Sequence, residues 1–260
     1  MNLRIKGKYA LVTGGTHGIG KAIAMVLADE GCNVAVCART LSRLRETEKQ
    51  VRAKGVDCLA IQADATTKKD VKRVFNKIIK EWGSLHILVN NVGGGGRWGT
   101  EDIINTDEKV WQEVYDKNVI SSIRFIQLAI PYMRTQKWGR IVNITSLYGR
   151  EAGGRPWFNI AKTMQTTLIK NLSLKKEIVR DGVTFNCIAP GSIMIPGTGW
   201  YKEQEKDPVA FKSMLDEKFP LGRLGSSEEV ADLVVFICSE RASLINGASI
   251  AVDGSEGKSF

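Results

Sequence analysis

The amino-acid sequence predicts an α/β fold in which a single doubly wound parallel sheet of about seven strands carries helices on both faces. Short apolar runs alternate with helix-length segments along the whole chain. The runs are nearly continuous in apolar residues, a pattern typical of strands buried on both faces. No linker rich in proline, glycine or serine divides the 260 residues. We therefore expect residues 1–260 to form one domain.

The expected strands are short, and the segments between them are long enough for one helix each. Strands are expected at residues 9–12, 33–37, 58–61, 87–90, 141–145, 184–189 and 249–252. The first strand leads through a glycine-rich turn into a helix over residues 21–30. Near the other end, Ser226 or Ser227 precedes two glutamates, the order typical of a helix N-cap. That helix is expected to run to about residue 239.

Composition excludes several classes of protein. Hydrophobic residues make up 43% and charged residues 25%, ordinary values for a globular protein with a large core. No run of 18 apolar residues is present, and the N-terminus does not read as a secretory signal, so we expect no membrane association. The five cysteines are scattered and odd in number, which favours free thiols in a reducing compartment such as the cytoplasm. With two histidines and no suitable carboxylate cluster, no metal site is expected.

The chain is basic, with a formal charge of +9 and a pI near 9.3. Much of this charge lies in two helical segments, 43–54 and 68–80. Solvated outer helix faces are the simplest interpretation of such runs. No aromatic side chains are interleaved with them in the manner of nucleic-acid-binding motifs. We expect an affinity for small anionic ligands and no nucleic-acid partner.

A glycine-rich turn after the first strand predicts a dinucleotide site. The turn reads Thr13-Gly14-Gly15-Thr16-His17-Gly18-Ile19-Gly20 and is followed by a good helix. Glycines at positions 14, 18 and 20 permit a tight turn and let backbone amides and a helix N-terminus approach a pyrophosphate. The strand before and the helix after are the context that such a turn requires. A Rossmann-type sheet that binds a dinucleotide is the resulting prediction.

The end of the second strand indicates which dinucleotide is preferred. A carboxylate there would bind the ribose 2′-hydroxyl of NAD(H), but this chain has Ala38 followed by Arg39 and Thr40. Arg39 is suited to a 2′-phosphate, and His17 offers a further donor. NADP(H) is therefore favoured and NAD(H) remains possible. The alternative is that Arg39 is simply an exposed residue at the start of a helix.

The stretch 141–162 holds the side chains that suggest chemistry. It runs from an apolar strand through Ser146 into a helix that carries Phe158 and Lys162, which lie one turn apart on the same face. A tyrosine at position 158 would have its pKa lowered from about 10 by the neighbouring ammonium and would trade protons with a carbonyl compound. Phenylalanine fills nearly the same space and has no proton to trade.

These motifs resemble those of the short-chain dehydrogenase/reductase family over nearly the whole chain. The glycine turn is similar to that family's TGxxxGxG turn, residues 90–93 (Asn-Asn-Val-Gly) to its NNAG segment, and Pro190-Gly191 to its PG turn. Asn118, Ser146 and Lys162 match its catalytic asparagine, serine and lysine. Phe158 stands where the family has tyrosine, and the interval from Ser146 is about one residue shorter than is common.

The resemblance implies a role for each matching residue. Ser146 would orient the substrate oxygen, residue 158 would exchange its proton, Lys162 would lower the pKa of residue 158 and hold the cofactor ribose, and Asn118 would hold a water that links Lys162 to solvent. The cofactor set would be Gly14, Thr16, His17, Gly18, Ile19, Gly20, Arg39, Thr40, Asp64, Asn91, Gly93, Lys162, Pro190, Gly191 and Ile193. A homotetramer, or a homodimer, is the implied assembly.

Each of these residues also has a structural interpretation. Asp64 or Thr66 would serve as a helix N-cap. Asn118 would tie backbone carbonyls at a helix kink, and Ser146 would cap the turn after its strand. Lys162 would pair with a surface carboxylate. Tyr148 is the nearest spare phenol, but its place in a loop makes it a poor substitute for residue 158.

Phe158 leaves two hypotheses for function. The first is an oxidoreductase that interconverts a secondary alcohol and a ketone by hydride transfer, in which the tyrosine was replaced, deliberately in order to trap a substrate. The second is a naturally silent dinucleotide-binding protein that acts as a sensor or assembly partner. The joint presence of Asn118, Ser146 and Lys162 favours the first.

Arginine and aromatic side chains around the expected pocket suggest a small polar or anionic substrate. Candidates are Arg97, Trp98, Ser146, Arg150, Arg155, Trp157 and Trp200. Arginine binds carboxylate or phosphate through two hydrogen bonds, and aromatic rings cover flat apolar faces. The alternative is that these arginines lie at a solvent-exposed rim.

Residues 195–217 begin with proline and glycine and become amphipathic, which favours a mobile lid over the substrate. The alternative is a static segment on the protein surface.

Overall fold

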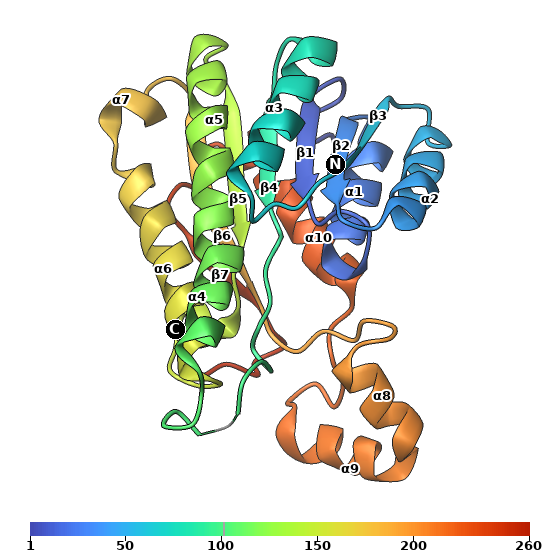
Figure 1. Ribbon diagram of the computed structural model, residues 1–260. Helices are drawn as coiled ribbons and strands as arrows, with labels where there is room; N and C mark the ends of the chain where they lie inside the picture. The colour runs from blue at the N-terminus through green and yellow to red at the C-terminus, as the bar shows by residue number, and fades with distance from the viewer. Residues whose placement is uncertain (101) are drawn as a thin grey trace.

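The computed structural model describes residues 1–100 and 102–260 and contains one seven-stranded sheet. Its order is β3-β2-β1-β4-β5-β6-β7, and every neighbouring pair is parallel (Figure 1). The strands are β1 Tyr9–Thr13, β2 Asn33–Ala38, β3 Cys58–Gln62, β4 Ile87–Asn90, β5 Gly139–Ile144, β6 Val183–Pro190 and β7 Ser249–Val252. The predicted doubly wound α/β fold is confirmed.

Helices cover both faces of the sheet. One face carries α1 Gly18–Asp29, α2 Leu41–Arg52 and α10 Ser227–Ile237. The other carries α3 Lys68–Trp82, α5 Ser121–Thr135 and α6 Pro156–Ser173. Successive residues of a strand point to opposite faces, so Ala10 and Val12 of β1 belong to the first core cluster and Leu11 to the second. Burial on both faces explains why the strands read as continuous apolar runs.

The helix ends show which local signals the sequence carried. Ser226 caps α10, and its side chain and that of Glu229 each accept a backbone N–H, so the expected N-cap signature is a full capping box. This helix ends at Ile237, two residues before the expected end. At the other end of the chain, α1 starts at Gly18, three residues earlier than expected, because the glycine turn closes directly into the helix.

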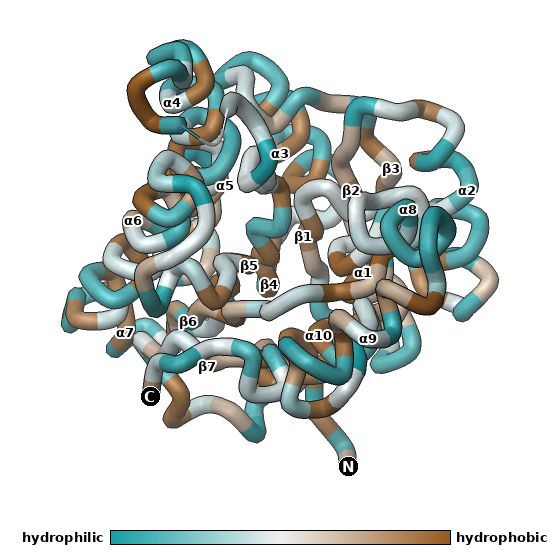
Figure 2. The backbone as a smooth tube through the Cα atoms, turned by 90° about the horizontal axis from the view of Figure 1, so that it is seen from below, coloured by the Kyte–Doolittle hydropathy of each residue, from teal (hydrophilic) through white to brown (hydrophobic). Residues whose placement is uncertain are grey.

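Beyond the carboxyl ends of the strands, residues 195–217 form two helices. These are α8 Gly199–Lys206 and α9 Pro208–Lys218, which project below the sheet (Figure 1). They have a small core of their own, built from Phe211, Leu215, Phe219 and Leu224 with Trp200 packed against it. Seen from below, the central strands lie between α4 Glu108–Tyr115 and α6 on one flank and α8 and α9 on the other (Figure 2). We call α8 and α9 together the α8–α9 lobe.

The remaining elements are short. They are the π-helical segment η1 Asp116–Ile120 between α4 and α5, the 3-10 turns η2 Leu147–Gly149 and η3 Glu240–Ala242, and α7 Lys176–Val179. Within residues 1–100 and 102–260, no helix is long and apolar enough to cross a membrane. In that same part of the chain, no three side chains of histidine, cysteine, aspartate or glutamate gather in a way that would hold a metal ion.

Candidate active site

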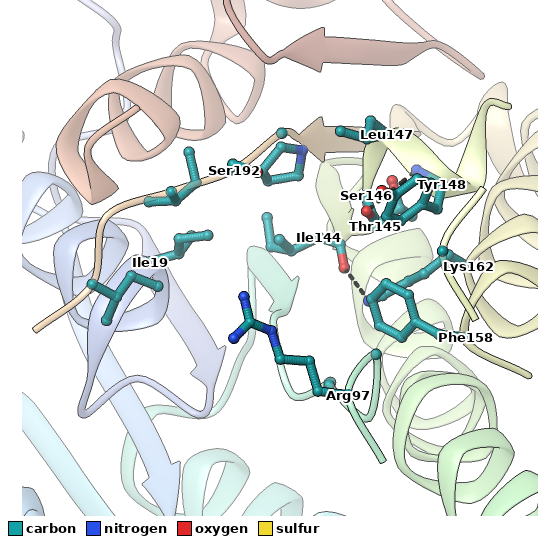
Figure 3. A pocket seen from close by; sticks show the side chains of 18 of the residues that line it. Ile19, Arg97, Ile144, Thr145, Ser146, Leu147, Tyr148, Phe158, Lys162 and Ser192 are labelled. Carbon is teal, nitrogen blue, oxygen red and sulfur yellow. Dashed lines mark hydrogen bonds between the residues drawn. The ribbon is translucent and has the colours of Figure 1, made fainter. Parts of the chain in front are cut away.

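Two adjoining cavities lie at the carboxyl ends of the strands. The first, of about 1000 Å³, is bordered by the residues that follow β4, β5 and β6 and by α8 (Figure 3). The second, of about 670 Å³, is bordered by those that follow β1 to β4. Asn91 and Gly93 line both cavities. Because strand order reverses between β1 and β4, this is the crevice in which open α/β sheets bind their ligands.

The glycine turn forms the floor of the second cavity. Gly14 lies there with a φ of 67°, a left-handed conformation that favours glycine, and its N–H donates to the carbonyl of Cys37 at 2.8 Å. Asn91 Nδ2 donates to the carbonyls of Thr13 at 3.0 Å and Gly14 at 3.3 Å. A Cβ at Gly20 would lie only 2.3 Å from that nitrogen. Asn91 therefore holds the turn in shape, and Gly20 is required for its close approach.

Most of the other residues expected around a dinucleotide also line these cavities. Thr16, His17, Arg39, Thr40 and Asp64 border the second, whereas Ile19, Pro190, Gly191 and Ile193 border the first. Gly18 lies in the turn but faces a separate groove toward α2, which Thr16 and His17 share. The ring of His17 lies 3.2 Å from the carbonyl of Pro196 and so connects the turn to the segment that leads into the α8–α9 lobe.

The helix cap expected near Asp64 is at a different residue. Asp64 Oδ1 accepts from the N–H of Thr66 at 2.9 Å and from its hydroxyl at 2.7 Å, which forms a tight turn before the helix begins. The N-cap of α3 is Thr67, whose hydroxyl accepts from the N–H of Asp70. The prediction that Asp64 or Thr66 is the N-cap is therefore wrong, because the turn places the helix start one residue later.

Lys162 is buried beside the first cavity rather than paired with a surface carboxylate. Its side chain is 4% exposed, and its ammonium donates to the carbonyl of Ile144 and to Gln165 Oε1, each at 3.0 Å. A Cβ at Gly93 would lie 3.0 Å from Nζ, so the loop after β4 presses directly against the amine. Burial lowers the pKa of Lys162 from its usual 10.5 to about 7, the thiol of Cys187 opposes this shift, and the charge of Lys117 adds to it.

Phe158 presents its ring to the same cavity. The ring centroid lies 5.6 Å from Nζ of Lys162, and both side chains point into the cavity in Figure 3. A Cβ at Gly96 would lie 3.3 Å from the ring, so the glycine-rich loop after β4 packs against it. The ammonium faces the ring, which offers it a weak cation–π contact and no exchangeable proton.

Ser146 and Tyr148 line the same cavity and lie on the same side of it as Lys162 and Phe158 (Figure 3). The Ser146 hydroxyl accepts from the N–H of Tyr148 at 3.3 Å and so caps the turn after β5, while its own proton is left for another acceptor. Burial, followed by the carboxylates of Glu256 and Glu151, raises the pKa of the Tyr148 phenol. Tyr148 is therefore a neutral hydrogen-bond donor at physiological pH and not a base.

Asn118 makes the contacts of its structural interpretation. It is fully buried within the π-helical segment, and its Nδ2 donates to the carbonyls of Gly94 and Val114, each at 2.8 Å. Its Oδ1 accepts from the N–H of Gly94 at 3.1 Å. The amide therefore fixes the loop after β4 to the kinked helix. Its backbone carbonyl, which the π-helical turn leaves available, accepts from Gln165 Nε2 at 2.8 Å.

The residues expected to bind substrate divide into two groups. Arg97, Arg155 and Trp200 line the first cavity, and the guanidinium of Arg97 lies over the Trp200 ring at 5.2 Å from its centroid. Arg97 also pairs with Glu203 at 3.0 Å. Arg155 donates to the carbonyls of Trp98 and Gly99 at the cavity edge.

The other three expected substrate residues lie elsewhere. Trp98 borders the second cavity, with Nζ of Lys117 4.5 Å from its ring centroid. Trp157 is 2% exposed and packs edge-on against Trp111, so it is a core residue. Arg150 donates to the hydroxyl of Ser259 and to the carbonyls of Ser249 and Phe260, which ties it to the carboxyl-terminal tail instead of the cavity.

The structure also adds side chains that the sequence patterns did not single out. Arg43 and Lys117 border the second cavity, and burial, followed by the charge of Arg39, lowers the pKa of Lys117. Ser192 and Glu256 border the first, where the Glu256 carboxylate accepts from the N–H and hydroxyl of Ser192. These positions belong to no short motif, and only tertiary structure brings them to the cleft.

Comparisons with known proteins agree with this geometry. The family model described as "Enoyl-(Acyl carrier protein) reductase" matches residues 14–255. The 3-oxoacyl-[acyl-carrier-protein] reductase FabG of Staphylococcus aureus is 36% identical over 251 residues, which covers 95% of this chain and 97% of that protein. The corresponding reductase of Aquifex aeolicus is 34% identical over 257 residues, which covers 98% and 99%.

Solved structures extend the likeness to three dimensions. L-sorbose reductase from Gluconobacter frateurii, complexed with NADPH and L-sorbose, superposes with a TM-score of 0.91 at 32% identity over all of both chains. An active-site complex of Pseudomonas aeruginosa RhlG with NADP superposes with a TM-score of 0.87 at 30% identity and 98% coverage of each chain. The chain therefore belongs to the short-chain dehydrogenase/reductase family of NAD(P)-dependent oxidoreductases.

Proposed function

We propose that this protein is an NADP(H)-dependent oxidoreductase that interconverts a secondary alcohol and a ketone, with phenylalanine in the place of the proton-exchanging tyrosine. One observation carries the proposal: a buried lysine and Ser146 face a single cavity that continues, past Asn91 and Gly93, to the glycine turn. The decisive measurement is oxidation of NADPH by the Phe158→Tyr variant.

The residues present fit a nicotinamide dinucleotide. The glycine turn leads into the N-terminus of α1, whose N-cap residue His17 makes no side-chain hydrogen bond to the helix amides, and a Cβ at position 20 would collide with Asn91. At the other end, an ammonium has three donors, and Lys162 uses two of them on Ile144 and Gln165. The third is available to a ribose hydroxyl. When bound, the nicotinamide ring would give or take the hydride.

Each side chain then has a definite task. The hydroxyl of Ser146 donates to the substrate oxygen and orients it. The ammonium of Lys162 holds the cofactor ribose and supplies positive charge beside position 158. Asn118 keeps the loop after β4 in place, which sets the position of Gly93 against the amine. Phe158 contributes shape alone, so the native chain is expected to bind both partners and to turn over slowly.

NADP(H) is the proposed cofactor because the chain that follows β2 brings Arg39 and Arg43, and no carboxylate, to the second cavity. Arg39 is exposed there, with Arg43 one turn further along the chain. Two of the similar structures contain NADPH or NADP, and a hydroxysteroid dehydrogenase with 26% identity contains NADH. NAD(H) therefore remains a possible second cofactor.

Replacing Arg39 by alanine is expected to weaken NADPH binding about 10- to 100-fold, because a charge-assisted hydrogen bond to phosphate contributes about 1.5–3 kcal/mol. NADH, which lacks the 2′-phosphate, should lose less than threefold. Quenching of the intrinsic tryptophan fluorescence measures both dissociation constants. Arg45→Ala, an exposed substitution on α2 outside both cavities, is the matched control. Equal losses for the two cofactors would remove the basis for the NADP(H) preference.

The proposed substrate is small and polar or anionic, such as a sugar acid, a sugar derivative or an acyl-carrier-linked keto compound. Arg97, Arg155 and Trp200 offer two guanidinium groups and a flat aromatic face around the cavity. The named substrates of the similar proteins, 3-oxoacyl groups on a carrier and L-sorbose, belong to these classes. Residues 195–217, which contain most of the α8–α9 lobe and supply Trp200 and Glu203 to the cavity wall, are the proposed lid over the substrate.

A second candidate function is a silent dinucleotide-binding protein that acts as a sensor or assembly partner. The observation in its favour is Phe158 itself, since nothing on that ring can exchange a proton. Such a protein would bind NADPH as tightly as the proposed enzyme. It would not gain turnover when a phenol is supplied at position 158.

A homotetramer, or a homodimer, is the proposed assembly. Ile160 and Met164 are 49% and 39% exposed and lie one turn apart on α6, next to a small apolar hollow bordered by Trp111 and Tyr115. Light scattering should give a mass four times that of the 28.7-kDa chain for the tetramer, or twice that mass for the dimer. Ile160→Arg should lower that mass, whereas a monomeric native protein would contradict the proposal.

All five cysteines are buried free thiols, which suits the proposed cytoplasmic location.

A further inference from the structure

Gln165 connects the amine of Lys162 to the backbone of Asn118. Its Oε1 accepts from Lys162 Nζ at 3.0 Å, and its Nε2 donates to the carbonyl of Asn118 at 2.8 Å. Gln165 is fully buried, and Lys162 is 4% exposed. One side-chain amide therefore fills the space between the lysine on α6 and the carbonyl released by the π-helical segment.

This is the path along which the family resemblance implies a proton relay. A water or hydroxyl passes protons because one oxygen atom both accepts and donates. In an amide the acceptor is the oxygen and the donor is the nitrogen, so a proton taken up at Oε1 cannot leave from Nε2 without converting the group to its unstable imidic tautomer. The amide is also uncharged throughout the physiological pH range. A proton cannot pass from Lys162 to Asn118 through Gln165.

The Lys162 ammonium has protein neighbours on its other sides as well. One donor goes to the carbonyl of Ile144, and the Phe158 ring covers the side toward the helix N-terminus at 5.6 Å. On the cavity side, Gly93 lies against the amine, where a Cβ would come within 3.0 Å of Nζ. The charged or titratable neighbours that act on the ammonium are Cys187 on β6, whose thiol pKa burial raises to about 12, and Lys117 on η1.

We propose that Gln165 is a positioning residue that fixes the Lys162 ammonium toward the cofactor and closes the protein-side proton path, so that protons enter or leave the reaction only from the cavity. The inference rests on the proposed oxidoreductase function and extends it. Phe158 and Gln165 then both interrupt the proton relay that the family resemblance implies. Phe158 lacks the phenol that would exchange the proton, and Gln165 fills the position through which a proton would pass from Lys162 toward Asn118. Lys162 is left as a binding and electrostatic group without a role in proton transfer.

The hydrogen bonds can be tested on the native chain without any substrate. With ¹⁵N-labelled glutamine, the side-chain amide signal of Gln165, identified by its loss in Gln165→Leu, should exchange with solvent at least 100-fold more slowly than that of the exposed Gln204. Its chemical shift should also follow the titration of Lys162 and should lose this pH dependence in Lys162→Met. Exchange as fast as that of Gln204 would overturn the proposal.

The effect on proton traffic is tested in the Phe158→Tyr background, with NADPH and the two probes L-sorbose and acetoacetyl-coenzyme A. Gln165→Ala opens space for a water, which needs about 30 Å³ and would have the Lys162 amine and the Asn118 carbonyl as partners. Gln165→Leu removes the same hydrogen bonds but keeps the space filled with apolar atoms. We expect Gln165→Ala to raise kcat at least fivefold over Phe158→Tyr alone and to lower its solvent isotope effect, with KM little changed, and Gln165→Leu to do neither.

The possible outcomes separate this inference from the proposed function. If Phe158→Tyr gains turnover and the alanine and leucine variants behave alike, the Gln165 proposal is wrong and the oxidoreductase function stands. If Phe158→Tyr gains no turnover on either probe, the oxidoreductase function fails. The exchange rate of the Gln165 amide still decides whether the residue holds Lys162.

Discussion

Phe158→Tyr is expected to raise NADPH-linked turnover of L-sorbose or acetoacetyl-coenzyme A by at least several tens-fold, because a positioned acid or base contributes about 10²- to 10⁴-fold. The substitution adds one hydroxyl to a ring that already faces the cavity, with the ammonium of Lys162 5.6 Å from the ring centroid. A positive charge at that distance favours the phenolate and lowers the phenol pKa from about 10. Ser146 already lines the same cavity, where its hydroxyl can orient the oxygen. Initial rates of NADPH oxidation measure the effect.

Two controls make the result specific to a phenol at position 158. Phe158→Leu, which also lacks a proton, should remain as slow as the native chain. Tyr148→Phe in the Phe158→Tyr background should keep most of the gain, because Tyr148 lies in the 3-10 turn after β5 and not on α6 one turn before Lys162. If the tyrosine variant binds NADPH as the native chain does but stays at the native rate, the silent dinucleotide-binding protein becomes the better account.

The fold was predictable because its signals are local and repeated. The strands at 87–90 and 249–252 were predicted to the residue, since each contains three successive apolar residues followed by a polar one. The strand at 141–145 was predicted less well, because Gly139 and Arg140 are buried in β5 although neither looks like a core strand residue. Arg140 lies there with its guanidinium bonded to the carbonyls of Gly139 and Gly182.

The candidate site was predictable only where a side chain's direction follows from a regular element. Phe158 and Lys162 share a face of α6 because residues four apart on a helix must do so. Arg150 and Trp157 were assigned to the pocket from proximity in sequence, but the loop between η2 and α6 turns Arg150 toward the tail and Trp157 toward Trp111. The contact between Gln165 and Asn118 joins residues 47 apart, and no local pattern reports such a contact.

Lys162→Met is expected to weaken NADPH binding about 10- to 100-fold at pH 6, because it removes the one free donor of a buried ammonium that faces the cavity. The loss should depend on pH. With the pKa of Lys162 at about 7, the native chain carries the ammonium at pH 6 and progressively loses it above pH 7. The native dissociation constant should therefore rise between pH 6.5 and 8.5, while that of the methionine variant stays nearly flat. Lys117 also borders the cofactor cavity, so the difference between the two proteins, and not the native curve alone, reports Lys162.

The ionisation of Lys162 should also make the free energy of unfolding of the cofactor-free protein depend on pH. A lysine with a pKa of about 7 when folded and about 10.4 when unfolded binds fewer protons in the native state between those values. The free energy of unfolding therefore gains a contribution that is absent below pH 7 and grows as pH rises toward 10. The buried thiols, whose pKa values are raised, oppose this gain near pH 9 in every variant alike, so the difference between variants is the readout. Between pH 6.5 and 9, the free energy of unfolding should change more favourably in the native chain and in the exposed control Lys170→Met than in Lys162→Met. If the gain persisted in Lys162→Met, the amine would titrate as an ordinary surface lysine, and the pH dependence of cofactor binding would need another origin.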